Sequence, residues 1–402
     1  MADPSESGPE PPAHNPGSQT ALRGRNVRRV METLIARGSS TQAELSRHTG
    51  LSKATVSNIV GVLARGGYVA TSPTTSSGRR AVMVRLEGRG AVAVGIDIGR
   101  RHVRVVLASL ARQVVAEREI PLPLGHRGEA GIEAAADVLE MLLADNGVER
   151  RAVLGVGVGI PGPIDRRTGT VAEGAILPQW VGLNVLRAIE DRLHLPVFID
   201  NDANLGALAQ VTWGPHAGVE DMVYLKIGTG IGCGLIIGGT PYYGHAGTAG
   251  EIGHSPITDS GPLCRCGNRG CLELAASTSV MIDALGRGRS TPITTDDIVR
   301  DALAGDTATL RVIEDAGLAA GKALAGVANL VNPELIVVGG PLAGLGEILL
   351  DPIRRGLLRY AMPLAGERTT VTVSSLGDRA EALGAAALVI RNVDLPAALA
   401  LL

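Results

Sequence analysis

Apolar residues recur along this chain in two periods, helical near its beginning and strand-like further on. Near the beginning, apolar residues at i, i+3, i+4 spacing predict an amphipathic helix that ends at Gly38: Val27, Val30, Met31, Leu34 and Ile35. The sequence TQAE at residues 41–44 has the pattern of a capping box and predicts a short second helix. A third helix is predicted to begin at the cap Ser52 and to end at Gly66.

The third predicted helix has an apolar side and a polar side. The apolar side consists of Val56, Ile59, Val60 and Leu63, and the polar side of its first two turns consists of Lys53, Thr55, Ser57 and Asn58. A polar tip, TSPTTSSGRR, and an alternating strand, AVMVRL, follow and predict a β-hairpin. Helix, helix, turn, helix and hairpin together predict a winged helix-turn-helix over residues 21–88.

From residue 91 onward, apolar strands alternate with helices. Two strand pairs have glycine turns, at residues 97–99 and at residues 228–232. The repeat of this pattern predicts a duplicated α/β fold whose two lobes enclose a cleft over residues 89–402. The expected arrangement resembles the architecture of sugar kinases of the actin-like ATPase (ribonuclease H-like) type.

Charge is distributed unevenly between these two regions. Residues 1–88 carry a net charge of +5 and the rest of the chain carries −7, and residues 22–88 alone hold 11 basic and 3 acidic residues. Such a basic module on an acidic body favours contact with a polyanion, here DNA. The third helix would enter the major groove with its polar side, while Arg79 and Arg80 at the hairpin tip would reach phosphate or the minor groove. The alternative is a small helical domain with a solvated basic face.

The composition also bears on the core, the tail and the compartment. Glycine accounts for 54 of 402 residues and aromatic residues for only 2%, so we expect a core of Ala, Val, Leu and Ile with close backbone approaches. Residues 1–20 are rich in Pro, Ser, Glu and Gly, which predicts a disordered tail without a signal peptide. No uncharged apolar stretch reaches the length of a membrane span, so we expect a cytoplasmic protein without membrane contact.

The stretch GEIGHSPITDSGPLCRCGNRGCLE at residues 250–273 holds three of the four cysteines. The spacing H-x9-C-x-C-x4-C, formed by His254, Cys264, Cys266 and Cys271, predicts one structural zinc ion per chain, because three thiolates and one imidazole make a closed tetrahedral site. The alternative is four unrelated residues in a glycine-rich loop. Glu251 and Glu273 flank the cluster without fitting its spacing, so an ordered loop could direct them elsewhere.

Four motifs between residues 22 and 390 resemble the ROK family of repressors, open reading frames and sugar kinases: IDNDAN, GTGIGCG, GHAGTAGEIGH and CRCGNRGCLE. Family members with an N-terminal winged helix are generally sugar-sensing transcriptional regulators. The resemblance implies that Asn201, Asp202, Glu251, His254 and Glu273 bind sugar, with His254 using one ring nitrogen for zinc and the other for a sugar hydroxyl. In the kinases of the family, the residue that matches Asp202 is the general base.

The phosphate side of the resemblance is weaker. The kinases carry a first phosphate turn of the type Asp-x-Gly-Gly-Thr-Lys, whereas this chain reads DIGRRH at residues 97–102. Arg100 and Arg101 would obstruct the approach of a phosphate to the backbone, or would bind an anion themselves. Glycines of two later turns remain and fit nucleotide binding or fold geometry equally well: Gly228 and Gly230 around Thr229, and the pair Gly339 and Gly340.

The sequence is compatible with three functions. The first is a sugar- or sugar-phosphate-responsive regulator of transcription without kinase activity, which binds operator DNA as a homodimer or homotetramer; we expect a repressor, although the sequence does not separate repression from activation. The second is an ATP-dependent hexokinase that carries a DNA-binding head, against which Arg100 and Arg101 argue. The third is a constitutive architectural DNA-binding protein, which would leave the sugar-binding residues without a role.

Overall fold

The computed structural model provides side-chain detail for most of the chain. The described residues are 19–76, 78–88, 90–162, 164–165, 168–171, 177–287 and 291–393. They divide into two compact units. Of the described residues, the first unit holds those up to Val92 together with Ser109–Gln113 and Val393, and the second holds Ala93–Ala108 and Val114–Asn392.

The first unit is a winged helix-turn-helix, as its sequence pattern predicts. Its elements in chain order are α1 (Gln19–Arg37), β1 (Ser40–Thr41), α2 (Gln42–Thr49), α3 (Lys53–Arg65), β2 (Val69–Ser76) and β3 (Arg79–Leu86). The predicted capping box of Thr41 and Glu44 is present, and the Ser52 side chain accepts a hydrogen bond from the backbone of Thr55. Helix α1 begins at Gln19, inside the last two residues of the predicted tail, and the two-residue strand β1 on β3 was not expected.

The core of this unit consists of the apolar residues that the helical pattern singled out. Val30, Met31 and Leu34 of α1 are fully buried, as are Leu45 and Val56. The predicted apolar side of α3 is buried throughout, so its polar side is left at the surface. Burial of one side of α3 therefore orients the other side toward solvent.

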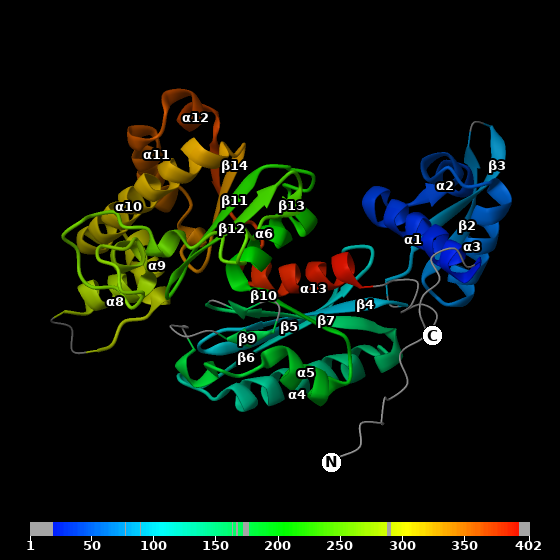
Figure 1. The fold of residues 1–402 in the computed structure, drawn as a ribbon, viewed down its shortest axis with the longest axis horizontal. Coiled ribbons are helices and arrows are strands. Elements are labelled where there is room, and N and C mark those ends of the chain that lie inside the picture. The colour runs from blue at the N-terminus through cyan, green and yellow to red at the C-terminus, as the bar shows by residue number, and fades with distance from the viewer. Residues whose placement is uncertain are drawn as a thin grey trace, which may run out of the picture. The chain divides into compact units, whose positions relative to one another are not determined.

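The second unit contains two five-stranded sheets. The first sheet has the order β10-β7-β4-β5-β6 and consists of β4 (Val92–Ile98), β5 (His102–Ser109), β6 (Val114–Pro121), β7 (Val153–Ile160) and β10 (Val197–Asn201). Helices α4 (Gly128–Asn146) and α5 (Val185–Leu193) lie on one side of this sheet, and α13 (Ala380–Asn392) lies on the other (Figure 1). A small ribbon of β8 (Ile164–Asp165) and β9 (Thr170–Val171) completes this lobe.

The second sheet repeats this arrangement with the order β13-β12-β11-β14-β15. Its strands are β11 (Met222–Ile227), β12 (Ile231–Ile237), β13 (Thr240–Pro241), β14 (Leu335–Gly339) and β15 (Thr370–Val373). The remaining helices are α6 (Asp202–Trp213), α7 (Glu273–Ala276), α8 (Thr278–Gly286), α9 (Thr295–Leu303), α10 (Thr307–Val331), α11 (Glu347–Tyr360) and α12 (Pro363–Arg368). In both sheets a three-stranded meander is extended by two later strands beside its first strand, which confirms the predicted duplication and the α/β fold class.

Helices α6 and α13 pack against each other between the two sheets, α13 on β7 and α6 on β11 and β12. Glycine allows these close contacts. A Cβ at Gly384 of α13 would lie 1.8 Å from the carbonyl oxygen of Leu205, and a Cβ at Gly157 of β7 would lie 2.0 Å from that of Ala385. The high glycine content thus brings the central helices near backbone contact with their neighbours.

None of the helices in the described part of the chain combines the length and the apolar character that crossing a bilayer requires.

Candidate functional site

A cleft with a volume of about 470 Å³ opens in the second unit. Its walls come from the ends of β4 and β10, the turn between β11 and β12, and the loop that leads to the cysteine cluster. All residues that the family resemblance assigns to sugar binding line this cleft: Asn201, Asp202, Glu251, His254 and Glu273. Residues from distant parts of the sequence are thus brought together at one site.

Asn201 and Asp202 lie where β10 ends and α6 begins. The Asn201 side chain caps α6, because its Oδ1 accepts a hydrogen bond from the Ala203 backbone at 2.8 Å, and its Nδ2 donates to the Gly162 carbonyl at 3.0 Å. Oδ1 of Asp202 accepts from the same Ala203 N–H at 2.9 Å. Both side chains are therefore held rigidly at the N-terminus of a helix, where a carboxylate is also favoured by the helix dipole.

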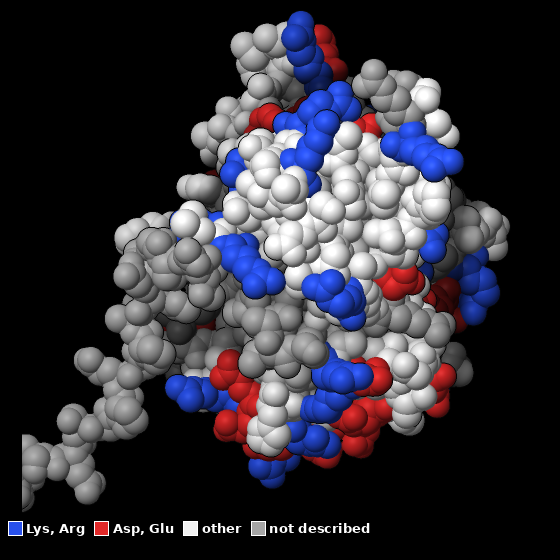
Figure 2. Space-filling view, turned by 90° about the vertical axis from the view of Figure 1, so that its right-hand side faces the viewer, with Lys and Arg blue, Asp and Glu red and all other residues white. Residues whose placement is uncertain are grey.

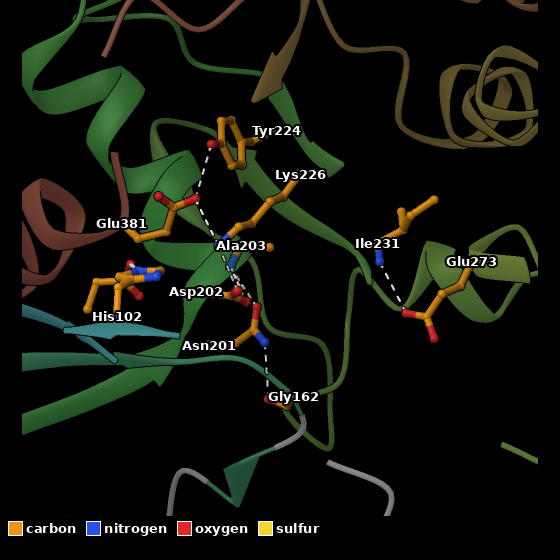
Figure 3. A network of polar contacts seen from close by, with 11 residues as sticks. His102, Gly162, Asn201, Asp202, Ala203, Tyr224, Lys226, Ile231, Glu273 and Glu381 are labelled. Atoms are coloured by element: carbon orange, nitrogen blue, oxygen red, sulfur yellow. Dashed lines mark hydrogen bonds and ion pairs between the residues drawn. The ribbon is translucent and has the colours of Figure 1, made fainter. Parts of the chain in front are cut away.

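A buried ion-pair network, which the sequence did not reveal, surrounds Asp202. Nζ of Lys226 on β11 lies 2.8 Å from Oδ2 of Asp202 and 3.2 Å from Oε1 of Glu381. The Tyr224 hydroxyl donates to the same Glu381 oxygen at 3.3 Å. Figure 3 shows Lys226 reaching from its strand toward both carboxylates. Lys226 also lines the cleft, so it belongs to the candidate ligand site.

The charges of this network determine its protonation. Burial alone would lower the pKa of Lys226, but the carboxylates of Asp202, Glu381 and Asp97 raise the pKa of the ammonium group well above its usual value. Burial raises the pKa of Glu381 more than the attraction of Lys226 lowers it. Lys226 is therefore held as a cation beside Asp202 at neutral pH.

The cysteine cluster brings four potential metal-ligating side chains together. Ligand atoms of His254, Cys264, Cys266 and Cys271 all lie within 4.8 Å of one another. Sγ of Cys264 lies 3.6 Å from Nδ1 of His254, and Sγ of Cys266 lies 3.7 Å from Sγ of Cys271. Zinc bonds of about 2.3 Å to sulfur and about 2.0 Å to nitrogen at tetrahedral angles place two sulfurs roughly 3.8 Å apart, and sulfur and nitrogen roughly 3.6 Å apart. The residues present therefore fit a zinc ion.

The same loop presents polar groups to the cleft. Because Nδ1 of His254 faces the thiols, Nε2 is on the far side of the ring, 4.0 Å from the carboxylate of Glu251. Glu273 contacts two further residues, which the sequence did not predict. It accepts a hydrogen bond from the Ile231 backbone at 3.1 Å and forms an ion pair with Arg265 at 3.1 Å. Glu273 thus connects the cysteine loop to the turn between β11 and β12, as Figure 3 shows for Ile231.

The second glycine turn lies at the cleft, whereas the later pair of glycines does not line it. Gly228, Thr229 and Gly230 line the cleft, and the Ser279 hydroxyl donates to the Thr229 carbonyl at 2.9 Å. Close packing explains Gly339 and Gly340. A Cβ at Gly339 would lie 2.0 Å from the Tyr224 hydroxyl, and a Cβ at Gly340 would lie 2.2 Å from the Ile227 carbonyl oxygen. Fold geometry is therefore a sufficient reason for that pair.

The first turn carries its two arginines at the cleft. Arg100 and Arg101 both line it, and neither forms an ion pair or a side-chain hydrogen bond within the described part of the chain. His102 is hydrogen-bonded to Asp97 at 2.9 Å. Burial would lower the pKa of His102, but the bond to Asp97 raises it above the usual value. The side chains of this turn are therefore bulky and basic where the kinase pattern has Gly, Thr and Lys.

The candidate DNA-contacting residues lie on the first unit. Lys53, Ser57 and Asn58 on α3 are exposed, whereas Thr55 is half-buried and its hydroxyl lies 2.8 Å from that of Ser52. The structure thus leaves Ser57 and Asn58 freer than Thr55 to reach a base. Arg80 on β3 is exposed, while the side chain of Arg79 lies outside the described part of the structure. In the upper part of Figure 2, Lys and Arg are spread over a largely uncharged surface with few acidic residues.

Comparison with known protein families gives two matches. Residues 93–392 match the ROK family, and residues 25–80 match the MarR family. The chain belongs to the ROK family. The resemblance drawn from the four motifs is thereby confirmed, and the MarR match agrees with the winged helix-turn-helix fold of the first unit.

Known relatives include a regulator and a kinase. The chain is 29% identical to a xylose repressor of Caldicellulosiruptor bescii over 94% of its own length and 98% of that protein. It resembles the crystal structure of a ROK family transcriptional regulator, a homologue of the Escherichia coli Mlc protein, with a TM-score of 0.78 at 25% identity over 94% of this chain and 98% of that one. A ROK family glucokinase from Streptomyces griseus, in complex with glucose and AMPPNP, matches 74% of this chain and 98% of its own, with a TM-score of 0.65 at 29% identity.

Proposed function

We propose that this protein is a sugar-responsive transcriptional repressor without kinase activity. The winged helix-turn-helix of the first unit binds operator DNA, and the cleft of the second unit binds a sugar or a sugar phosphate. Since winged and related helix-turn-helix proteins read paired half-sites as dimers, the protein acts as a homodimer or homotetramer. A protein that binds operator DNA works beside the chromosome, which places it in the cytoplasm.

One observation carries this proposal. A complete set of sugar-binding candidates meets in one cleft of a chain that also folds a winged helix-turn-helix. Carboxylates, an amide and an imidazole suit a sugar, because each hydroxyl needs a donor or an acceptor and charged partners form the stronger hydrogen bonds. A relative that matches this chain over nearly its whole length is named a xylose repressor, which agrees with the same assignment.

The absence of kinase activity is part of the proposal and rests on the first turn. In the kinase pattern, small residues let backbone N–H groups approach a phosphate. Arg100 and Arg101 occupy these positions and line the cleft. The similarity to a ROK glucokinase keeps an ATP-dependent hexokinase as the second candidate, in which Asp202 would be the base.

We also propose a structural zinc ion at His254, Cys264, Cys266 and Cys271, within a ligand-binding domain over residues 89–402 that follows the DNA-binding domain at 21–88. When bound, zinc would supply a fixed imidazole tautomer, so that Nε2 of His254 is available to a sugar hydroxyl. The loop would then hold Glu251 and Glu273 in place at the cleft wall.

The substitution Asp202→Asn tests the proposal. An amide keeps the shape of the side chain but removes one charge-assisted acceptor, which corresponds to about 1.5–3 kcal/mol of binding. We expect sugar-driven release from DNA to require a roughly ten- to hundredfold higher sugar concentration. DNA affinity without sugar should stay nearly unchanged. Operator sites selected from random oligonucleotides and a panel of sugars and phosphosugars provide the two ligands.

Asp191→Asn is the matched control, because Asp191 is exposed on α5 and does not line the cleft. Wild-type protein should also show no sugar-dependent ATP turnover in a coupled assay. Robust phosphorylation of a hexose by the wild type, lost in Asp202→Asn, would replace the repressor assignment by the kinase.

A further inference from the structure

Lys226 is a half-buried cation in the ligand cleft to which neither the motifs nor the proposed function gives a role. It lies on β11, two residues before the turn at Gly228, and its side chain is only 21% exposed. The chain contains two other lysines, Lys53 and Lys322, and both are exposed. A half-buried lysine at the wall of a cleft requires compensating charge, and its position there is unexplained by packing alone.

The compensating charges come from the two central helices. Asp202 is the first residue of α6 and Glu381 lies in the first turn of α13, so Lys226 joins the N-termini of both helices. These helices lie between the two sheets. Lys226 on the second sheet therefore holds one oxygen of the Asp202 carboxylate. The backbone of α6, which directly follows β10 of the first sheet, holds the other oxygen.

The hydrogen-bonding capacity of Lys226 is not exhausted by this arrangement. An ammonium group has three donors: the hydrogen bond to Asp202 uses one, and the ion pair with Glu381 engages at most a second. Among the described residues, the third donor has no partner, and Lys226 lines the cleft. Asp202 likewise retains acceptor capacity, since each carboxylate oxygen carries two lone pairs and each accepts one hydrogen bond from the described residues.

A donor and an acceptor held 2.8 Å apart form a matched pair for one hydroxyl group. A hydroxyl donates one hydrogen bond and accepts others, so it can donate to Asp202 and accept from Lys226 at the same time. A phosphate ester at that oxygen has no proton to donate and would bring negative charge toward Asp202 and Glu381. A hydrogen atom in place of the hydroxyl would leave both buried groups without their partner.

We propose that Lys226 is a specificity-determining residue of the ligand site, which donates a hydrogen bond to the oxygen of the same sugar hydroxyl whose proton is accepted by Asp202. This inference rests on the proposed sugar-binding function and deepens it. The effector carries a free, unphosphorylated hydroxyl at that position, whatever its substitution elsewhere.

The test measures sugar affinity by calorimetry for full-length wild type, Lys226→Met and Asp202→Asn. The probes are D-glucose, D-xylose and N-acetyl-D-glucosamine, followed by monodeoxy analogues of whichever of these the wild type binds. Lys226→Met should weaken binding about tenfold or more, as expected for loss of a charge-assisted hydrogen bond. Lys322→Met is the matched control: Lys322 is exposed, bonds the Ile257 carbonyl and does not line the cleft, so its loss should leave affinity unchanged.

The deoxy analogues distinguish contact from mere structural support. One analogue should bind with nearly equal affinity to wild type, Lys226→Met and Asp202→Asn, because it lacks the hydroxyl that both residues contact. If Lys226→Met does not fold, the double variant Lys226→Met/Glu381→Gln, which loses both charges of that ion pair, takes its place in the titrations. An equal loss for every analogue, or no loss at all, would overturn the inference and leave the sugar-binding function standing. Failure of the wild type to bind these probes or any member of the panel of sugars and phosphosugars would overturn both.

Discussion

His102 illustrates at the residue scale how one side chain changes a site. The family resemblance aligns it with the lysine of the kinase phosphate turn, yet in this fold it bonds Asp97 rather than facing a phosphate. Burial opposes ionisation of Asp97, but the hydrogen bond from His102 and the charge of Lys226 hold the pKa of Asp97 below its usual value. The turn is thus stabilised internally by an ion pair.

This ion pair predicts a pH-dependent contribution to stability. Because folding raises the pKa of His102, the pair stabilises the native state at pH values below about 6.5. The contribution disappears as the pH rises through the raised pKa. The difference in thermal unfolding temperature between wild type and His102→Gln should therefore be largest near pH 6 and should shrink toward pH 9.

The control for this measurement is His245→Gln, because His245 is exposed. Its unfolding temperature should follow that of the wild type at each pH. A His102→Gln difference that stays constant from pH 6 to pH 9 would mean that the imidazole acts through packing and carries no charge.

At the scale of elements, the cysteine loop acts as a support for two walls of the cleft. It provides His254 and Glu251 directly, and through Glu273 it holds the Ile231 backbone at the second glycine turn. A metal that orders this loop would therefore order the ligand site as well. Because a preformed site is absent from an unfolded chain, metal binding contributes to folding.

Cys271→Ser should lower both the thermal stability and the sugar affinity, and should reduce the metal content below one ion per chain. Elemental analysis of gently purified protein measures the zinc directly. Cys233→Ser is the control for metal content alone, since Cys233 is buried outside the cluster but lines the cleft. Wild-type protein that contains no metal would contradict the zinc assignment, as would a Cys271→Ser protein with full zinc.

The β2–β3 hairpin, which is the wing, and helix α3 are expected to contribute differently to DNA binding. Arg80 is exposed at the start of β3, as expected for a phosphate contact, so Arg79→Ala and Arg80→Ala should weaken binding to all sequences and reduce its salt dependence. Substitutions of Ser57 or Asn58 should change the preferred sequence instead, because these residues lie on the exposed face of α3. Fluorescence anisotropy at several salt concentrations separates the two effects.

Arg355→Ala provides the control for the wing, because Arg355 forms ion pairs with Asp351 and Glu314 on the second unit. It should leave both affinity and salt dependence unchanged. If the wing variants instead altered sequence preference at constant salt dependence, the hairpin would contact bases. The assignment of phosphate contacts to the hairpin and of base contacts to α3 would then be wrong.

Most elements were predictable from sequence, and the exceptions have physical reasons. Helix α6 leaves no helical signal in the sequence because it is buried on most sides, so that DANLGALAQVTW shows no polar face and little helical periodicity. Strand β6 was missed because VVAEREIP is mostly exposed or half-buried at a sheet edge and carries three charges. The network of Lys226 could not be predicted either, since Glu381 lies 157 residues after Tyr224 and no local pattern connects them.

At the scale of the whole molecule, the chain combines a DNA-binding unit with a duplicated ligand-binding unit. The two sheets of the second unit have equivalent strand orders, and Lys226, which lines the cleft, contacts the N-terminal turns of the two central helices between them. A ligand that bonds both Asp202 and Lys226 would therefore contact both lobes at once. Such a ligand has a different affinity for different lobe arrangements, which is the physical requirement for a ligand to shift a conformational equilibrium.

If sugar releases the protein from its operator, thermodynamic linkage requires that the operator weaken sugar binding by the same factor. Coupling of this kind typically corresponds to about 5- to 150-fold. Calorimetric titration of the sugar into free protein and into the protein–operator complex measures how much the operator weakens sugar binding. Anisotropy with and without sugar measures how much the sugar weakens operator binding. The two factors should agree. Asp202→Asn should move the midpoint of each titration to a higher sugar concentration, because it weakens sugar binding in either state. Equal sugar affinity with and without operator would show that the cleft and the DNA-binding unit are uncoupled, and the protein could then bind both ligands without responding to sugar.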